Sequence, residues 1–515
     1  MKPPIVWSVA GLDTGGGAGL SADQRAADAA GVHLCPVAAA LTAQNSVAVQ
    51  AVWPVPPEQL DAQLAALADD LPPVAVKTGL LGGVAQLRVV TRWVDRLRER
   101  GPVALVVDPV LGATTGASFA TEELLRAYRE ELLPRATAVT PNRREATRLV
   151  GEGSAPQQAV ALGVETVCIT GGDEPGPLAL DWLHSPHAQG WLGLPRRSAQ
   201  HHHGTGCCFA TALAAGLARG FVPADAVVLA KMLTASGLQP DASFGTPPGA
   251  GAGPVRPRGA FITDPALLPG LFSHAPSSWP GRAHAPAAPP AVEGVYGITD
   301  RGAHAAALFE AGLRTVQLRM KRGAQEPGAA WRTRLAAEVQ PARDAARRLG
   351  RTLILNDHWR AALALGVDFV HLGQEDLLAL DAADRADLAQ ARAQGLRLGL
   401  SSHSLWELAR AVAWAPDYVA CGPVWPTLTK DMPWHPQGLG NLAWWAAMAP
   451  MPVVGIGGVL APEQLVQVAA TGAAAGCVVR GLLSTPVADW QAAWRSGAGM
   501  PLTPEPGWPR PTLAG

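Results

Sequence analysis

The sequence lacks an excess of charge of either sign. Across its 515 residues, 41 lysines and arginines face 42 aspartates and glutamates, and charged residues make up only 16% of the chain. A chain this neutral has no basic field that would attract nucleic acid or an anionic membrane. We therefore expect no nucleic-acid or membrane partner, and any anion that the protein handles has to be bound by a local site.

Disulfide spacing and long apolar runs are also missing. The cysteines lie mostly in apolar stretches without the paired spacing of a disulfide framework; they are residues 35, 168, 207, 208, 421 and 477. No run of 18 apolar residues appears, and the N-terminal apolar segment is soon broken by Asp13 and glycines, unlike a signal peptide. These absences favour a cytoplasmic protein, and they leave open whether copies of it form a homo-oligomer.

The length of the chain predicts two large domains, because single domains rarely exceed about 250 residues. Between them, proline and alanine replace the periodic apolar residues, which is the composition of a semi-rigid linker. We expect a first domain over residues 1–272, a linker over 273–292 and a second domain over 293–496. The proline-rich end, residues 497–515, is expected to be a disordered tail.

Short strand-like runs alternate with helical stretches after the linker. There are eight, namely GVYGITD, TVQLRM, TLILND, FVHLG, RLGLSS, YVACGPV, PVVGIGG and GCVVRG. Eight short buried strands over about 200 residues predict a (β/α)8 TIM barrel, with a doubly wound sheet as the competing fold. Polar residues gather at the C-terminal ends of these strands, where barrels build their active sites, and this favours the barrel.

The first half alternates in the same way, with less even spacing. Its six strand-like runs are IVWSVAG, CPVAAAL, VAVKTG, VALVVDPV, TAVTPN and TVCITG. They predict an open α/β sheet with helices on both faces, and ligands in the crevice beyond the C-terminal ends of the strands.

The stretch HHHGTGCCFATALAAGLARG sets Cys207 between the turn Gly204-Thr205-Gly206 and an alanine-rich helix. A helix N-terminus offers unpaired N–H groups and a positive dipole end, so this turn is suited to cradle a phosphoryl group. The same field favours a thiolate, which would lower the pKa of Cys207 and let it take a proton from a substrate alcohol. The alternative is that Cys207 and Cys208 are small buried hydrophobic residues.

Other polar residues follow strands of the first half. The glycine-rich stretch SVAGLDTGGGAGLSAD lacks the Gly-Lys-Ser/Thr of a P-loop. Gln44 ends the run LTAQN, and its paired donor and acceptor suit the edge of a heteroaromatic ring. Asn142 and Glu145, in TPNRREA, suit Mg²⁺ and its waters beside ATP phosphates. No one of these signals identifies a site alone.

Together and in this order, the motifs resemble those of bacterial hydroxymethylpyrimidine (phosphate) kinases of the ribokinase-like superfamily, over residues 4–272. They are AGLDTGGGAGLSAD, ALTAQNSVAVQ, VKTGLL, VVDPVLGATTG, LLPRATAVTPNRREA and HHHGTGCCFATALAAGLARG. The resemblance implies a three-layer α/β sandwich that uses ATP. It implies the following roles: Asp23 and Gln44 bind the aminopyrimidine, Cys207 is the catalytic base, Asn142 and Glu145 are Mg-ATP ligands, and Gly204, Thr205 and Gly206 form the anion hole.

The first half departs from this resemblance at two places. Residues 12–17 read Leu-Asp-Thr-Gly-Gly-Gly where relatives usually have Ser-Asp-Pro-Ser-Gly-Gly, and Thr170 stands where relatives have a lysine before paired glycines. The missing lysine removes one cation from the phosphate pocket. The run His201-His202-His203 has no second cluster of the kind a metal site needs, and His203 matches a histidine usual in the family.

In the second half, QLRMK ends the second strand with Gln317, Arg319 and Lys321. Period-two alternation turns these three side chains to one face of the strand. An arginine fork and a lysine point charge on one face suit an anion such as diphosphate, and the alternative is an ordinary solvated basic stretch.

The next strands end in acidic and neutral polar residues. LILND supplies Asn356 and Asp357, HLGQED supplies Asp376, and SSH supplies Ser401 after the fifth strand. Carboxylates from neighbouring strand ends are suited to share one Mg²⁺, so a metal-bridged diphosphate is a plausible ligand.

The last loops carry further groups for phosphates. GPVWPTLTK places Thr427, Thr429 and Lys430 after the sixth strand. GIGG, with Gly457 and Gly458, follows the seventh strand, and VVRG follows the eighth. Barrels commonly bind a phosphate through backbone N–H groups at this place, so the second half has two anion sites on one face.

This second set of motifs resembles thiamine phosphate synthase over residues 294–485. The motifs are GVYGITD, VQLRMK, LILND, VHLGQED, GLSSH, GPVWPTLTK and VVGIGGV. The resemblance implies that Asp357 and Asp376 hold Mg²⁺, and that departing pyrophosphate is stabilised by Arg319, Lys321 and Lys430. It implies that the rings and phosphates are oriented by Gln317, Asn356, Ser401, Thr427 and Thr429. It also implies that Gly457 and Gly458 bind the thiazole phosphate. Where relatives commonly have serine, Arg480 either grips that phosphate or obstructs it, and we place it among the substrate-binding residues.

The two resemblances describe consecutive steps, because the kinase half would make the pyrimidine diphosphate that the barrel half consumes. We expect a bifunctional transferase of thiamine biosynthesis that uses Mg²⁺, ATP, hydroxymethylpyrimidine or its phosphate, and thiazole phosphate. Three alternatives remain: a kinase half acting on pyridoxal, a barrel half that is a thiazole tautomerase, and a half that only senses a ligand. Retention of Asp357, Asp376 and Lys430 favours the synthase over the tautomerase.

Overall fold

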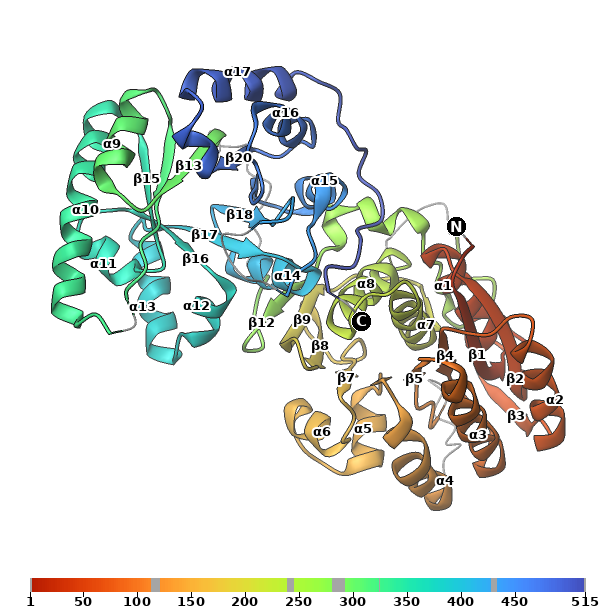
Figure 1. The fold of residues 1–515 in the computed structure, drawn as a ribbon. Coiled ribbons are helices and arrows are strands. Elements are labelled where there is room, and N and C mark those ends of the chain that lie inside the picture. Colours follow the sequence, from red (N-terminus) through yellow and green to blue (C-terminus); the bar gives the residue numbers. More distant parts are fainter. Residues whose placement is uncertain are drawn as a thin grey trace. The chain divides into compact units, whose positions relative to one another are not determined.

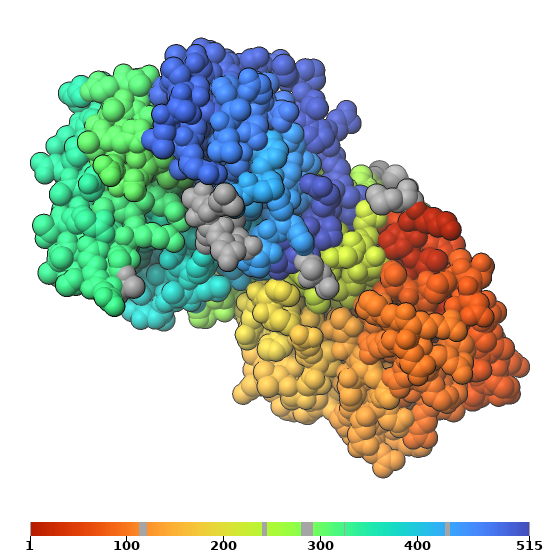
Figure 2. Space-filling view, viewed as in Figure 1, coloured from red at the N-terminus to blue at the C-terminus, as the bar shows by residue number. Residues whose placement is uncertain are grey.

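The computed structural model describes residues 2–112, 121–238, 245–279, 292–323, 325–427 and 433–513. The chain forms two compact units, Met1–Trp279 and Pro280–Thr512, and the boundary between them falls within the predicted linker, residues 273–292. Figure 2 colours the first unit red to yellow-green and the second green to blue. Among the described residues, no helix combines the length and apolar character needed to cross a membrane.

The first unit is built on one sheet of ten strands, in the order β12-β9-β8-β7-β6-β5-β4-β1-β2-β3. All six predicted strands are present. They are β1 (Ile5–Leu12), β2 (His33–Gln44), β4 (Ala75–Thr78), β5 (Ala104–Val107), β6 (Ala138–Val139) and β7 (Thr166–Ile169). They pair in parallel, so their C-terminal ends meet at one edge of the sheet.

Four further strands, which the sequence patterns did not predict, extend this sheet in antiparallel pairing. They are β3 (Val49–Pro54), β8 (Leu178–His184), β9 (Gln189–Pro195) and β12 (Gly270–Phe272). Short antiparallel strands need no crossover helix, so the strand-helix alternation that revealed the other six does not mark them. A separate short pair joins β10 (His201–His203) to β11 (Gly253–Pro254).

Helices cover both faces of the sheet, which gives the expected three-layer α/β sandwich (Figure 1). The helix α3 (Val84–Arg100) shows why these segments form helices that pack on the sheet. Apolar residues recur in it at helical spacing and are buried, namely Leu87, Val90, Val94 and Leu97. One face carries α1 (Gly19–Ala30), α7 (Thr205–Ala218) and α8 (Pro223–Ser236). The other carries α2 (Pro57–Ala68), α3, α4 (Glu122–Ala127), α5 (Arg143–Val150) and α6 (Ala155–Ala161).

The second unit is a closed barrel of eight parallel strands, which confirms the predicted TIM barrel. The strands are β13 (Gly294–Thr299), β14 (Thr315–Leu318), β15 (Thr352–Asn356), β16 (Phe369–Leu372), β17 (Arg397–Ser402), β18 (Tyr418–Cys421), β19 (Val453–Gly455) and β20 (Ala475–Val478). Helices alternate with them: α9 (Gly302–Glu310), α10 (Gly328–Leu349), α11 (Trp359–Ala364), α12 (Gln374–Ala379), α13 (Ala382–Ala393), α14 (Leu405–Trp414), α15 (Gly438–Met448), α16 (Pro462–Ala470) and α17 (Val487–Ala498).

Aromatic side chains fill the inside of the barrel. Tyr296, Phe369 and Tyr418 are buried there, and the rings of Tyr296 and Phe369 both meet the Tyr418 ring edge to face. Gly399 makes room for Tyr418, because a Cβ at that glycine would lie 2.2 Å from the tyrosine ring.

The structure differs from the expectation of a disordered tail. The stretch that we call the C-terminal tail, residues 499–512, lies against the barrel: the Thr503 N–H donates to the Ala470 carbonyl at 2.9 Å, and the His435 N–H donates to the Thr512 carbonyl at 2.8 Å. Its proline-rich composition prevents helix and sheet formation, but it does not prevent hydrogen bonding to a preformed surface, which composition alone does not reveal.

Substitution of Gly399 by alanine is expected to lower the free energy of unfolding of the barrel by about 1–3 kcal/mol, because the new methyl group overlaps Tyr418. Gly440→Ala is the matched control: nothing lies within 4 Å of its Cβ position, and alanine favours the helix. Denaturant unfolding of both variants measures the difference. Equal unfolding free energies would contradict the tight packing around Tyr418.

Candidate active sites

Two glycine-rich turns meet at the C-terminal edge of the first unit's sheet. Gly204 caps the N-terminus of α7 with φ at +86°, and a Cβ there would lie 2.4 Å from the Gly17 carbonyl oxygen. A Cβ on Gly17 would in turn lie 2.1 Å from the His203 ring. Only glycine fits such contacts, so the turn Gly204–Gly206 is held directly against the turn that follows β1.

Asp13 organises the turn after β1. Its carboxylate accepts hydrogen bonds from the N–H groups of Gly15 (2.8 Å), Gly17 (2.9 Å) and Ala18 (2.8 Å). Burial raises the pKa of Asp13, but His203 and these N–H groups outweigh that effect and hold the pKa below its usual value. Asp13 is therefore an ionised anchor of the turn.

Gln44 lies beside this anchor, at the end of β2. Its Nε2 is 3.2 Å from Nε2 of His203, which is itself 3.3 Å from the Asp13 carboxylate. The half-buried Gln44 amide is thus placed at the turn, next to the Gly204–Gly206 cradle, as a candidate to bind a ring edge.

Asp23 lies inside the unit, beside Lys77. Its side chain is completely buried, and its two oxygens accept hydrogen bonds from Ser8 (2.6 Å), Lys77 (3.0 and 3.1 Å) and Thr211 (2.8 Å). Its binding of the aminopyrimidine stays a prediction. In this structure Asp23 supports Lys77.

Lys77 and Asp108 are site residues that sequence reasoning missed. Lys77 lies fully buried between Asp23 and Asp108, with 3.7 Å between its Nζ and Oδ2 of Asp108. Burial lowers the pKa of Lys77, but Asp23, Cys207 and Asp108 raise it above its usual value, so the amine stays charged. A lysine within the apolar strand β4 was the signal that should have drawn attention.

Asp108 follows β5 and is not fully satisfied. Among the described residues, its Oδ2 has no hydrogen-bond partner. Burial raises the pKa of Asp108 to about 6, although Lys77 opposes this. A buried carboxyl oxygen without a donor is costly, so Asp108 is suited to meet a cation or donor brought by a ligand.

Cys207 sits in the first turn of α7, as predicted, but its ionisation differs. Burial raises the pKa of the thiol to about 12, although Lys77 and the Gly19 N–H both lower it. The expectation of a pKa lowered by the helix end is therefore wrong, because loss of hydration outweighs the dipole.

Asn142 and Glu145 hold each other at the start of α5. The Asn142 side chain accepts from the Glu145 N–H at 2.9 Å, and the Glu145 carboxylate accepts from the Asn142 N–H at 2.9 Å. Burial and then the nearby Asp108 raise the pKa of Glu145 to about 8. Asn142 also bridges to Thr170, which follows the neighbouring strand β7. These polar groups therefore gather at the same sheet edge as Asp108.

In the barrel, acidic and basic groups face each other. The carboxyl groups of Asp357 and Asp376 are neighbours, and burial and then this neighbour raise the pKa of Asp357 to about 6. Arg319 and Lys321 oppose that rise. The carboxyl pair comes from two neighbouring strand ends, and Asp376 is held by the Gly373 N–H at 2.9 Å.

A buried hydrogen-bond chain reaches from inside the barrel to Ser401. Tyr296 and Tyr418 share a hydrogen bond of 2.8 Å between their hydroxyls, Tyr418 is 2.8 Å from Nδ1 of His371, and Nε2 of His371 is 3.0 Å from Ser401 Oγ. Burial lowers the pKa of His371 to about 3, so the ring is neutral. On the neighbouring strands β14 and β15, the Gln317 side chain donates to the Asn356 side chain at 2.6 Å. No sequence signal joins the two tyrosines to this site.

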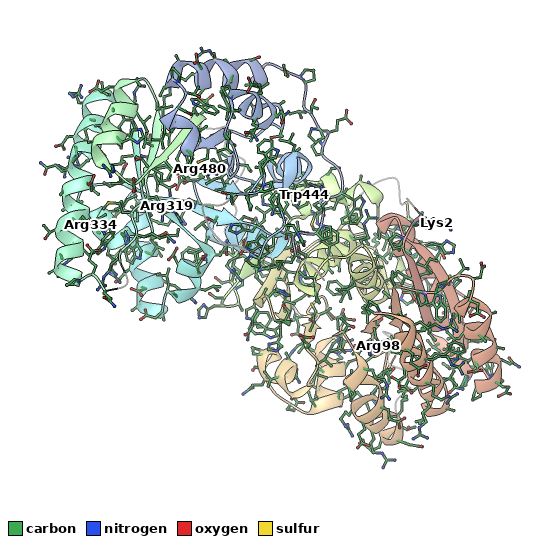
Figure 3. The ribbon with its side chains drawn as sticks, in the orientation of Figure 1. Lys2, Arg98, Arg319, Arg334, Trp444 and Arg480 are labelled. Carbon is green, nitrogen blue, oxygen red and sulfur yellow. The ribbon has the colours of Figure 1, made fainter. Side chains whose placement is uncertain are left out.

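The remaining predicted residues follow the last strands. Gly457 and Gly458 have φ values of +93° and +77°. A Cβ on Gly457 would lie 2.7 Å from Pro423, and a Cβ on Gly458 would lie 2.5 Å from Trp425. Thr427 is half-buried after β18, whereas Thr429 and Lys430 lie outside the described residues. Arg480 is exposed after β20; Figure 3 labels it with Arg319.

Both sites present groups that suit phosphates and a hard cation. Within the described residues, no three His, Cys, Asp or Glu side chains come together as a metal site. The Asp357–Asp376 pair nevertheless fits Mg²⁺, which typically binds one or two carboxylates and completes its shell with water and substrate phosphates.

Comparison with known proteins confirms both resemblances. A family model described as phosphomethylpyrimidine kinase matches residues 13–256, and one described as thiamine monophosphate synthase matches residues 295–482. A probable thiamine biosynthetic bifunctional enzyme of Oryza sativa subsp. japonica, described as chloroplastic, is 31% identical over 89% of this chain and 82% of its own. The thiamine-phosphate synthase of Rhizobium etli is 44% identical over 39% of this chain and 96% of its own.

Solved structures also match the first unit. A pyridoxal kinase of Bacillus subtilis in complex with ADP is 27% identical, with a TM-score of 0.46, over 51% of this chain and 99% of its own.

Replacement of Lys77 by methionine is expected to lower the unfolding free energy of the first unit by about 3–5 kcal/mol, because Asp23 and Asp108 would lose their buried counter-charge. Arg88→Met is the control, since Arg88 pairs with Glu131 at the surface and its loss should change stability little. Urea unfolding compares the two. Equal effects would show that the Lys77 pair does not hold the unit together.

The raised pKa of Cys207 predicts slow alkylation. With a pKa of about 12, only ~10⁻⁴ of the thiol is ionised at pH 8, and the rate should rise about tenfold per pH unit. Iodoacetamide labelling between pH 7 and 9, followed by peptide mass spectrometry, measures this, and Cys207→Ser identifies the labelled peptide. A rate that levels off near pH 7 would show that the helix end lowers the pKa of Cys207 more than burial raises it.

Proposed function

The chain belongs to the family of bifunctional thiamine biosynthetic enzymes, and from this membership we propose that it carries out two consecutive reactions. The first unit phosphorylates hydroxymethylpyrimidine, or its phosphate, with ATP to give the diphosphate. The barrel couples this diphosphate to thiazole phosphate and releases thiamine phosphate and pyrophosphate. The observation that carries the proposal is the presence, in each unit, of an anion-binding turn beside an acidic pair and cations, within the segments that the two family models match. The six free cysteines support a reducing compartment such as the cytoplasm.

In the first unit, the N–H groups at the start of α7 hold the phosphoryl group, and Gln44 binds the edge of the pyrimidine ring. The substrate hydroxyl oxygen attacks the γ-phosphorus of ATP, the bond to the ADP oxygen breaks, and the hydroxyl proton goes to the Cys207 sulfur. Cys207 accepts a proton only as a thiolate, so bound substrates have to lower its pKa. Lys77, charged and near the thiol, already acts in that direction.

In the barrel, Arg319, Lys321 and Lys430 stabilise the departing pyrophosphate. The carbon–oxygen bond between the pyrimidine methylene and the diphosphate breaks, and the thiazole nitrogen donates its electron pair to that methylene carbon. Gln317 and Asn356, joined at 2.6 Å, and Ser401, held by His371 at 3.0 Å, orient the pyrimidine. This is catalysis by positioning and charge, because no group of the chain becomes covalently attached.

The phosphates of the second substrate have their own ligands in this proposal. Gly457 and Gly458 bind the thiazole phosphate through backbone N–H groups, and Arg480, which follows β20, adds a charge. Thr427 and Thr429 supply hydroxyl groups.

Divalent metal fits both sites by the chemistry of their donors. Asn142 and Glu145 would hold Mg-ATP in the first unit, and Asp357 and Asp376 would hold Mg²⁺ in the barrel. In each place burial and then a neighbouring carboxyl group raise the pKa of Glu145 and of Asp357, and a cation relieves the repulsion between the carboxyl groups. When bound, Mg²⁺ neutralises phosphate charge.

The two steps can be separated by two variants of the full chain. With hydroxymethylpyrimidine, Mg-ATP and thiazole phosphate supplied, Cys207→Ala should form no thiamine phosphate until pyrimidine diphosphate is added. Arg319→Ala should slow formation by about 10²–10³-fold, and the diphosphate should accumulate. Chromatography of both products measures this, and each variant is the control for the other.

Two outcomes would contradict this assignment. If Cys207→Ala formed thiamine phosphate at the wild-type rate without added diphosphate, Cys207 would not be the base of the first step. A strong preference for pyridoxal, offered to the wild-type chain in place of hydroxymethylpyrimidine, would overturn the substrate.

A further inference from the structure

The C-terminal tail, residues 499–512, lies outside both segments that the family models match. After α17 it runs as an irregular stretch past α15 (Figure 1). The sequence offered no role for it. Its contacts with the barrel, however, are specific and partly buried.

The central contact joins Arg510 to Asn441 on α15. The Asn441 side chain is only 1% exposed; its Oδ1 accepts from the Arg510 backbone N–H at 2.7 Å, and its Nδ2 donates to the Arg510 carbonyl at 3.1 Å. One amide thus satisfies both backbone polar groups of a tail residue. The Arg510 guanidinium also donates to the Gln437 carbonyl at 3.0 Å, and Gly438 leaves room for it, because a Cβ there would lie 2.3 Å from Nη2.

Gln437 connects the contact between Arg510 and Asn441 to loops of the candidate active site. Its side chain is completely buried, accepts from Asn441 Nδ2 at 3.0 Å and donates to the His403 carbonyl at 2.8 Å. Its backbone N–H donates to the Pro423 carbonyl at 2.7 Å. A continuous set of buried amides therefore links the tail to the loops that follow β17 and β18.

These two loops carry candidate substrate-binding residues. His403 comes two residues after Ser401, and Pro423 opens the loop that contains Thr427. Pro423 also packs against Gly457, whose Cβ position lies 2.7 Å away. A shift of Gln437 would thus be felt at the places where the proposed reaction orients the pyrimidine and the phosphates.

We propose that the C-terminal tail is a strap that positions the loops after β17 and β18 for the barrel reaction, with Arg510 and Asn441 as positioning residues. The proposal rests on the proposed function. Without the tail, water replaces its hydrogen bonds to Asn441, Gln437 and His435, and these residues are no longer held by a fixed partner. Loops that sample more conformations bind phosphates less well, because such catalysis depends on prior positioning.

The experiment compares two shortened chains, one ending at residue 499 and one ending at residue 512, with wild type. The chain ending at 499 should lose about tenfold in kcat/KM for thiamine phosphate formation, chiefly through a higher KM for thiazole phosphate, and keep the kinase step unchanged. The chain ending at 512 should behave as wild type. Asn441→Ala in the full chain should reproduce the loss, and in the shorter chain it should add only what the Asn441–Gln437 hydrogen bond contributes.

Arg495→Ala, at an exposed position of α17, is the matched control for Arg510→Ala, and only Arg510→Ala should raise that KM. Hydrogen exchange gives a measurement that does not depend on activity. In the chain ending at 499, amides of residues 402–407 and 422–427 should exchange faster, while those of β13–β15 and of the first unit stay as in wild type.

Three results would overturn the strap: unchanged kinetics in the chain ending at 499, unchanged exchange in the two loops, or a general loss of protection over the barrel, which would make the tail a folding element. Failure of the proposed function has a different signature, because the wild-type chain itself would then form no thiamine phosphate, while the exchange measurement still decides about the strap.

Discussion

Carboxyl groups held close together away from water repel each other, and both units of this chain hold such groups beside cations. In the first unit Lys77 lies between Asp23 and Asp108, and burial and then Asp108 raise the pKa of Glu145. In the barrel Asp357 meets Asp376 opposite Arg319 and Lys321. Burial and then a neighbouring carboxyl group raise the pKa of Asp108, Glu145 and Asp357, so the ionised forms of these groups are disfavoured at these positions. A ligand that brings cations and phosphates together offsets this cost, so the same burial and repulsion that cost stability favour binding.

The two sheets are unrelated, but the same geometry brings acidic and basic groups together in both. Parallel strands bring their C-terminal ends to one edge or one mouth, so residues distant in sequence are forced together there. The apolar strands behind them supply the stability, as the buried residues of the first sheet and the aromatic inside of the barrel show. Glycines complete the arrangement where backbone approaches backbone, at Gly204 against Gly17 and at Gly457 against Pro423. Activity in each unit thus depends on a rigid scaffold and a few close turns.

Sequence patterns predicted the architecture better than the ionisation of the site. The eight barrel strands and six of the first unit's strands follow from alternation with helices, and the same patterns placed Gln44, Asp357 and Asp376 at strand ends. The predicted role of Asp23 stays a prediction, but its partners could not be predicted, because a carboxylate in a motif gives no sign that Ser8, Lys77 and Thr211 donate to it. Cys207 was placed correctly and its pKa wrongly, because the helix dipole can be inferred from local sequence, whereas burial depends on what packs above the helix.

The amino-acid sequence by itself determined the two-domain organisation, the strand order along the chain and the residue types at the strand ends, because these depend on local composition and periodicity. Only the tertiary structure decided which of those residues meet. It brought Tyr296 and Tyr418 into line with His371 and Ser401, and it laid Arg510 of a proline-rich tail on the buried Asn441. The physical reason is that hydrogen bonds between residues far apart in the chain, and the hydration that they replace, are set by three-dimensional packing and leave no periodic trace in the sequence.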